Sequence, residues 1–163
     1  MKKALLVSGI VIACSISFAY TFQSAYASII NRTDSPGRNV IAAVHHDFPA
    51  AKQITWKQQG KAEIAQFTMT ERSIRAIYDQ SGRLLETFIT EQPQNIPFEV
   101  QTAIEQKYEG YIPQAVTEYI STQEHSFYVL LKNQQGHQVK WLRIKSSEDG
   151  DILQIVQKLQ QTI

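Results

Sequence analysis

The chain has 163 residues, 43% of them hydrophobic, and its 16 basic and 15 acidic residues give a formal net charge of +1 at neutral pH. A chain with so balanced a charge lacks the positive field expected of a protein that binds nucleic acid or an anionic membrane surface. Its single cysteine, Cys14, excludes a disulfide within the chain.

The first element along the chain, residues 1–27, has the pattern of a signal peptide. Lys2 and Lys3 form a short cationic start, residues 4–22 are almost wholly apolar, and Ala25-Tyr26-Ala27 is the small-x-small sequence that signal peptidases cleave. Cleavage after Ala27 predicts a periplasmic or secreted protein that keeps no membrane span.

Two other interpretations of this apolar run stay open. About 20 apolar residues can cross a bilayer, although Ser8, Ser15 and Ser17 interrupt the run and favour its removal. Residues 11–14, Val-Ile-Ala-Cys, also resemble a bacterial lipoprotein box, so a lipid anchor at Cys14 is the alternative to soluble export.

Residues 28–37 come next and contain turn-forming residues without apolar periodicity, which predicts a flexible leader. From residue 38 the pattern is helical, because Val40, Ala43, Val44 and Phe48 recur at the spacing of one helix face and Pro49 closes the segment. A short amphipathic helix with one buried face is expected.

Segments with the alternating apolar residues of strands follow this helix, each bounded by turn residues, at residues 54–58, 61–69, 73–79 and 83–90. The alternation indicates an antiparallel sheet with one covered face. Gln80-Ser81-Gly82 supplies the last of these turns.

The same order of elements returns after residue 93. Val100, Ala103, Ile104 and Tyr108 lie 60 positions after the first helical stripe, and four more strand segments follow at residues 116–121, 126–132, 138–145 and 151–159. The sequence therefore predicts an α+β fold, a tandem repeat of a helix packed on a four-stranded antiparallel sheet, with units at residues 38–93 and 94–163. One α+β domain with coincidental spacing is the alternative.

Several strings resemble those of a known family. Residues 48–56, FPAAKQITW, resemble the F-P-x-A-x-x-(apolar)-x-W signature of the PepSY-like, β-lactamase-inhibitor-like (BLIP-like) domains of exported bacterial proteins. Residues 78–84, YDQSGRL, are similar to the family's Y-D-x-x-G-x-L turn, Ile96-Pro97 to the pair that opens its second helix, and residues 108–111 to its Y-x-G-Y.

This resemblance implies a helix across a four-stranded sheet in each repeat and a non-enzymatic role in the periplasm or at the cell surface. The inhibitor that gives the fold its name binds its target with a concave, aromatic-rich sheet face. The second unit lacks a counterpart of Trp56 in its first strand, so the two halves are not expected to be fully symmetric.

The sequence offers little for catalysis or for metal and cofactor binding. His45-His46-Asp47 is the one suggestive cluster, but adjacent helical residues point about 100° apart and cannot both face one ion, so a solvated helix face is expected. No G-x-S-x-G, S-x-x-K, H-E-x-x-H or glycine-rich phosphate loop occurs. We expect no enzyme activity, no metal and no cofactor.

Aromatic residues on the expected strands are the remaining signal. Phe127 and Tyr128 must point to opposite faces of their strand, so one of them lies away from the helix. We predict a protein or peptide partner on the open sheet face, with Tyr119, Tyr128 and Trp141 as contacts. The alternatives are a small-molecule or envelope-component binder with a pocket between helix and sheet, and a propeptide-like modulator of a secreted enzyme.

Overall fold

The computed structural model describes residues 29–30 and 35–162. Its helices are α1 (Arg38–Asp47), the 3₁₀ turn η1 (Pro93–Asn95) and α2 (Phe98–Lys107). Its strands are β1 (Ile29–Ile30), β2 (Lys52–Gln59), β3 (Ala62–Met69), β4 (Arg72–Tyr78), β5 (Leu84–Glu91), β6 (Ile112–Ser121), β7 (His125–Gln135), β8 (Gln138–Ser147) and β9 (Ile152–Thr162). The expected signal peptide and Cys14 lie outside the described residues.

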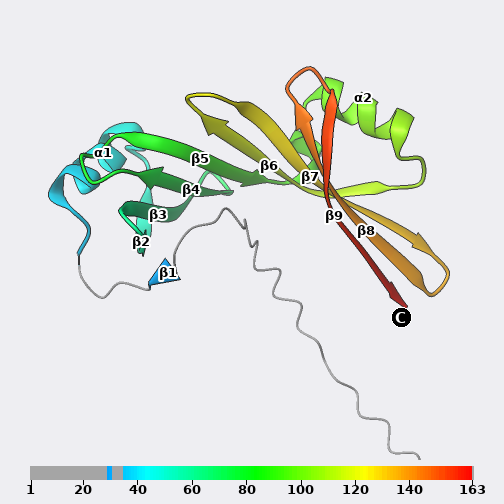
Figure 1. Cartoon of the computed structure of the whole chain (residues 1–163), viewed down its shortest axis with the longest axis horizontal. Coiled ribbons are helices and arrows are strands. Elements are labelled where there is room, and N and C mark those ends of the chain that lie inside the picture. The colour runs from blue at the N-terminus through cyan, green and yellow to red at the C-terminus, as the bar shows by residue number, and fades with distance from the viewer. Residues whose placement is uncertain (1–28, 31–34, 163) are drawn as a thin grey trace, which may run out of the picture.

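The described strands form one antiparallel sheet in sequence order from β1 to β9, with the eight long strands β2–β9 making up nearly all of it. Figure 1 shows β5 and β6 across the middle of this twisted sheet, with α1 and α2 near its opposite ends. Both helices and all eight long strands occur where the sequence predicts them, although several strands are longer than expected.

The predicted fold class, an α+β tandem repeat of a helix packed on a four-stranded antiparallel sheet, is wrong, because one continuous sheet replaces the two four-stranded ones. Strands β5 and β6, on either side of the expected boundary, pair continuously from Glu86↔Ser121 to Glu91↔Val116. This pairing satisfies backbone groups that two separate sheets would leave unpaired at their edges. The molecule is a single, mostly β structure that carries two helices.

Both helices lie on the same face of this sheet. Residues paired directly across antiparallel strands share a face, and the pairs Ile74↔Ile89, Ile89↔Glu118 and Glu118↔Phe127 connect β4 to β7. Ile74 belongs to the hydrophobic core with α1 and Phe127 to the core with α2. We call the opposite side of the sheet the helix-free face.

Two separate hydrophobic cores fill the space beneath the helices. Val40 and Val44 of α1 are fully buried, as are Val100 at 0% and Ile104 at 1% exposure on α2, which confirms the helical stripes expected from the sequence. The core beneath α1 also contains Ala65, Phe67, Ile74, Ala76 and Tyr78. The core beneath α2 also contains Ile96, Val116, Phe127, Val129, Leu131, Leu142 and Ile144.

A glycine turn locks each helix to the sheet. Gly82 follows β4 and Gly150 follows β8, with φ of +90° and +86°. A Cβ atom at Gly82 would lie 2.8 Å from the carbonyl oxygen of Asn39 in α1, and one at Gly150 would lie 2.5 Å from that of Glu99 in α2. Only glycine allows both the left-handed backbone and so close an approach.

Candidate functional site on the helix-free face

A row of aromatic rings crosses the helix-free face. Phe88 on β5 and Tyr119 on β6 are paired across the strands, with ring centroids 5.0 Å apart. Tyr119 and Tyr128 of β7 meet edge-on, with centroids 6.3 Å apart. Successive residues of a strand point to opposite faces of the sheet. Phe127 therefore points towards α2 with the rest of its core, and Tyr128 points to the helix-free face.

The three residues proposed from the sequence as partner contacts, Tyr119, Tyr128 and Trp141, all lie on this face. Trp141 on β8 pairs with Lys132, and Leu142 next to it points into the core beneath α2. Sequence reasoning placed Phe88 on a strand but did not select it. Its facing could have been inferred from Ile89, because the neighbour of a core-facing strand residue points away from the core.

Cationic side chains cover these rings. The guanidinium carbon of Arg75 lies 4.1 Å from the ring centre of Phe88, and that of Arg143 lies 5.3 Å from the ring centre of Tyr128. The ammonium groups of Lys145 and Lys132 each lie 5.7 Å from a ring centre, that of Tyr128 and that of Trp141 respectively. Sequence reasoning missed all four cations, because none of them belongs to a recognisable motif.

The pKa of Arg75 shows that the cations at the two ends of the aromatic row act on each other. Burial lowers the pKa of Arg75, Glu86 opposes that shift, and repulsion from Arg143 adds to it. Arg75 is on β4 and Arg143 on β8, so these like charges interact across the helix-free face. The face therefore gathers positive charge from strands far apart in the sequence.

Two carboxylates moderate this charge. Glu124 forms an ion pair with Lys145, and the hydrogen bond from Lys145 is the main cause that lowers the pKa of Glu124. Burial acts to lower the pKa of Lys145, but its hydrogen bonds to Glu124 and Tyr128, with the charges of both groups, raise that pKa overall. Glu86 lies close enough to influence Arg75 and also Tyr119, whose pKa burial raises.

The rings are not bare on this face. Phe88 is 6% exposed, and Tyr119, Tyr128 and Trp141 are only partly exposed. Among the large hydrophobic residues that are exposed in the described chain, Ile112 and Leu159 share this face, because they pair with Lys132 and Trp141. The others are Phe98, Ile120, Leu153, Ile155 and Val156. A molecule that approaches this face meets cationic groups held over ring faces.

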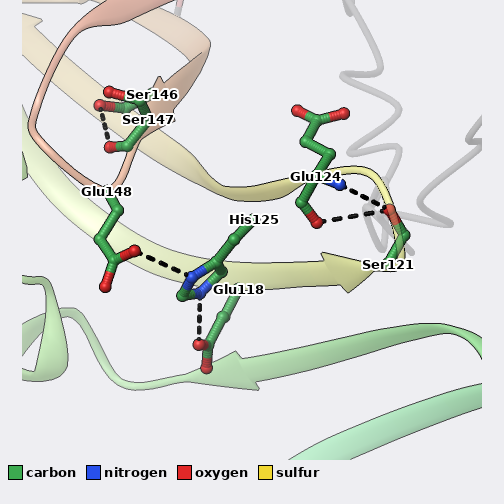
Figure 2. A network of polar contacts seen from close by, with 7 residues as sticks. All are labelled: Glu118, Ser121, Glu124, His125, Ser146, Ser147 and Glu148. Carbon is green, nitrogen blue, oxygen red and sulfur yellow. Dashed lines mark hydrogen bonds and ion pairs between the residues drawn. The ribbon is translucent and has the colours of Figure 1, made fainter.

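A second polar cluster lies on the helix side, around His125 at the start of β7. Figure 2 shows its ring between two carboxylates: Nε2 is 2.8 Å from Glu118 of β6, and Nδ1 is 3.2 Å from Glu148 in the β8–β9 turn. Only the doubly protonated ring can donate to both. Because the carboxylates approach opposite sides of the ring, they cannot join it around one metal ion.

The cluster His45-His46-Asp47 has a structural contact. Tyr78 donates a hydrogen bond of 2.9 Å from its hydroxyl to Asp47, and His46 contacts the other oxygen of that carboxylate at 2.9 Å. Burial, followed by the bond to Asp47, raises the pKa of Tyr78. Both histidines are exposed, and among the described residues no group of three His, Cys, Asp or Glu is placed to hold a metal.

An open groove of about 370 Å³ lies beyond the C-terminal end of α2. Its lining includes Tyr108, Tyr111, Lys140 and Lys158, with apolar residues of β8 and β9. Its lining residues come from the segment after α2 and from β8 and β9, and none belongs to α2 itself. No helix in the described chain is long and apolar enough to span a membrane.

No family model matches the sequence, and no curated protein matches it. Solved structures with the same fold include a BLIP-like protein from Bacteroides fragilis, with 22% identity, a TM-score of 0.64, and coverage of 77% of this chain and 88% of that one. The chain has a BLIP-like fold.

Two further structures from the same genus agree with this assignment. A candidate periplasmic protein from Bacteroides eggerthii is 18% identical, with a TM-score of 0.64 and coverage of 80% and 91%. A DUF2874 family protein from Bacteroides uniformis is 17% identical, with a TM-score of 0.62 and coverage of 79% and 90%. At these identities the likeness establishes the fold and not the function, and membership of the PepSY-like family stays a prediction.

Proposed function

We propose that the chain is an exported, non-enzymatic protein that binds a protein or peptide partner through the helix-free face of its sheet. The observation that carries this proposal is the row formed by Phe88, Tyr119 and Tyr128, with cations over its rings. Aromatic residues and arginine are the residue types enriched where binding energy concentrates in protein interfaces.

The rigidity of this face favours binding by complementary shape. Its side chains project from central strands with partners on both sides, so the backbone beneath them is fixed by hydrogen bonds. The helices cover the other face, and on this face Tyr119 and Tyr128 keep partial exposure. Side chains already ordered by ring contacts lose less conformational entropy when a partner binds.

Export rests on the sequence pattern of residues 1–27, and the candidate periplasmic protein that shares the fold is consistent with it. The proposed location is the periplasm or the exterior after cleavage behind Ala27, with a lipid anchor at Cys14 as the alternative. Mass spectrometry of the protein from its own cell envelope distinguishes the two, because cleavage predicts Ser28 as the first residue and lipidation predicts an acylated Cys14.

The test of the binding face is affinity capture from the envelope of the producing organism. Tyr128→Ser and Trp141→Ser are compared with the wild type and with Phe98→Ser. Phe98 is a suitable control because it is an aromatic residue with 77% exposure on α2. We expect proteins captured by the wild type and by Phe98→Ser to be lost with both face variants, while thermal unfolding shows that all variants fold. Capture of the same proteins by every variant would contradict the proposal.

A second candidate function, the binding of a small molecule, is favoured by the groove lined by Tyr108, Tyr111, Lys140 and Lys158. Its size is within the usual range of small-ligand sites. Its two lysines favour an anionic ligand. If this function is correct, an envelope extract will raise the melting temperature of the wild type but not of Lys140→Glu, and variants of Tyr128 will respond like the wild type.

A further inference from the structure

We infer that the outer edge of β9 is a second interaction surface, where an extended polypeptide segment with alternating acidic and apolar side chains pairs as a further strand. The part of β9 that accepts this segment is residues 157–162. The inference goes beyond the proposed function, because it concerns the edge of the sheet and the groove beside it, and not the aromatic row on the helix-free face.

The two edges of the described sheet differ in how they are covered. At one edge, β2 pairs with β1 and carries two lysines, Lys52 and Lys57. At the other edge, β9 pairs with β8 alone within the described chain, and Lys158 is its one charged residue. An edge strand with few charges and no proline presents its outward N–H and C=O groups to another chain. The backbone of β9 can therefore accept an added strand.

The register of β9 with β8 decides which part of this edge is regular. Two irregularities interrupt the pairing and leave Leu153 and Val156 as extra residues on β9. Such bulges bend a strand and disrupt its ladder of hydrogen bonds. Residues 157–162 are paired without interruption, so an added strand is expected to align with this stretch.

Side chains of this stretch alternate between the two faces of the sheet. Lys158 pairs with Leu142, which belongs to the core beneath α2, so Lys158 lies on the helix side. Leu159 pairs with Trp141 on the helix-free side and is 40% exposed. The residues of an added strand alternate in the same way, so one of them faces Lys158 and the next packs against Leu159.

The groove beyond α2 places a second cation on the helix side of this edge. Lys140 and Lys158 both line the groove. Neither lysine has an ion pair or a hydrogen bond from its side chain within the part of the chain that the structure describes. An acidic side chain across from a cation stabilises the pairing of two strands. We therefore assign acidic residues to the helix side of the added segment and apolar residues to its other side.

The same charges argue against a second copy of this chain as the occupant. Two β9 strands paired antiparallel over residues 157–162 would bring Lys140 and Lys158 of both copies onto one face. Like charges on neighbouring strands are destabilising. A small anion could meet the lysines, but it has no backbone groups to pair with the edge of β9. An acidic, extended segment of another polypeptide satisfies both the lysines and the edge.

The first test is fluorescence anisotropy with the full mature chain and a fluorescein-labelled peptide of three Val-Glu repeats. We expect saturable binding, and a loss of affinity of at least about tenfold in Lys158→Glu, because the reversed charge repels the glutamates. Lys140→Glu is a second variant with the same expected direction. Lys61→Glu is the control, since Lys61 is an exposed lysine between β2 and β3. A peptide of three Val-Lys repeats should not bind.

The second test separates strand pairing from capture of carboxylates by the groove. Two further peptides carry N-methyl groups on the backbone nitrogens of either the three valines or the three glutamates. In a paired strand, the N–H groups that face one neighbour belong to alternate residues. One methylated peptide should therefore lose its affinity and the other should keep it. Equal affinity of the two methylated peptides would overturn the inference.

Other results would also overturn it: no binding of the Val-Glu peptide, or equal binding to the wild type and to both lysine variants. A dimer in sedimentation equilibrium that dissociates when the peptide is added would show that a second copy occupies the edge, and the inference would be wrong.

The two proposals fail separately. Tyr128→Ser should bind the Val-Glu peptide like the wild type. If Tyr128→Ser loses the peptide and Lys158→Glu does not, acidic segments bind the helix-free face, and the inference about β9 is wrong. If the peptide depends on Lys158 but capture of envelope proteins depends on neither Tyr128 nor Trp141, the proposed function is wrong and the inference about β9 stands.

Discussion

The half of the sheet beneath α1 and the half beneath α2 differ mainly in how far their strands extend past the helix. Both helices have 10 residues. Strands β2–β5 have 7 or 8 residues, whereas β6–β9 have 10 or 11. β9, the last strand of the described sheet, exposes Leu153, Ile155, Val156 and Leu159. The half with the longer strands therefore leaves more apolar surface uncovered.

The two halves also anchor the ends of their helices differently. At the end of α1, Tyr78 reaches from the core to Asp47. Just after α2, the side-chain amide of Asn133 on β7 donates a 2.7 Å hydrogen bond to the carbonyl oxygen of Gly110. The core beneath α1 supplies its own anchor through Tyr78, whereas the end of α2 is anchored by the buried Asn133 beside its core.

The largest expected effect comes from the glycine turns, and it should be greater in the second half. Gly150→Ala places a Cβ closer to a backbone carbonyl than Gly82→Ala does, and both require an unfavourable φ. We expect each to lower the free energy of unfolding by about 2–4 kcal/mol, with Gly150→Ala the more severe.

Urea denaturation measures these losses. Gly136→Ala is the control, because Gly136 also has a positive φ but no atom within 4 Å of the position that the added methyl group would take, and it should lose only about 1 kcal/mol. Equal losses at all three glycines would show that the close approach to the helices does not matter.

The second largest effect is expected from the loss of the hydrogen bonds that Tyr78 and Asn133 make at the ends of the two helices. Tyr78→Phe and Asn133→Ala each leave a polar group without its partner, and we expect each to cost about 1–2 kcal/mol. Tyr78→Phe should also change the response to alkali. The pKa of Tyr78 is raised in the folded state, so its hydroxyl loses its proton at a lower pH in the unfolded chain than in the folded one. The free energy of unfolding therefore falls as the pH rises above about 10.

Thermal unfolding at neutral and alkaline pH tests this prediction. Tyr108 and Tyr119 have raised pKa values as well, so the comparison is between wild type and Tyr78→Phe. Removal of Tyr78 should make the alkaline loss of stability smaller. The same alkaline loss in both proteins would show that the ionisation of Tyr78 contributes nothing to the effect.

A smaller effect is expected at the turn that follows β8. Its Glu148 also contacts His125 of β7, whereas the hydrogen bonds to Asp79 in the turn after β4 come from residues of that turn. His125→Gln should lower the free energy of unfolding by less than about 1 kcal/mol, because the ion pairs are partly exposed. Urea denaturation measures this loss. His137→Gln, in the exposed β7–β8 turn, is the control variant. A large loss in the control would mean that the two contacts of His125 are not the cause.

The smallest effect is expected at the turn that follows β4. Asp79 accepts hydrogen bonds from Ser81 and from Arg83, which lower its pKa to about 2. A carboxyl whose pKa is lower in the folded state than in the unfolded chain stabilises the folded state. This contribution is fully present at pH values above the pKa in the unfolded chain, near 3.9. That contribution is lost as the pH falls towards 2. Asp79→Asn should therefore remove part of the acid sensitivity between these limits, measured by circular dichroism. An unchanged acid transition would contradict this assignment.

Much of the candidate site could be predicted from the sequence. The period of two placed Phe127 and Tyr128 on opposite faces of their strand, and the structure shows Phe127 in the core beneath α2. The cations over the rings could not be predicted, because they come from different strands. Arg75 and Arg143 are 68 positions apart in the sequence, and only the pairing of β5 with β6 brings their strands into one sheet.

By itself, the sequence determined both helices, the eight long strands and the glycine turns, because these depend on local periodicity and on backbone conformations open to few residue types. Only the tertiary structure decided that the strands form one sheet, that both helices share a face, and that cations gather over the aromatic row. These features depend on which strand edges pair, and an unpaired edge can find a partner that local sequence does not specify.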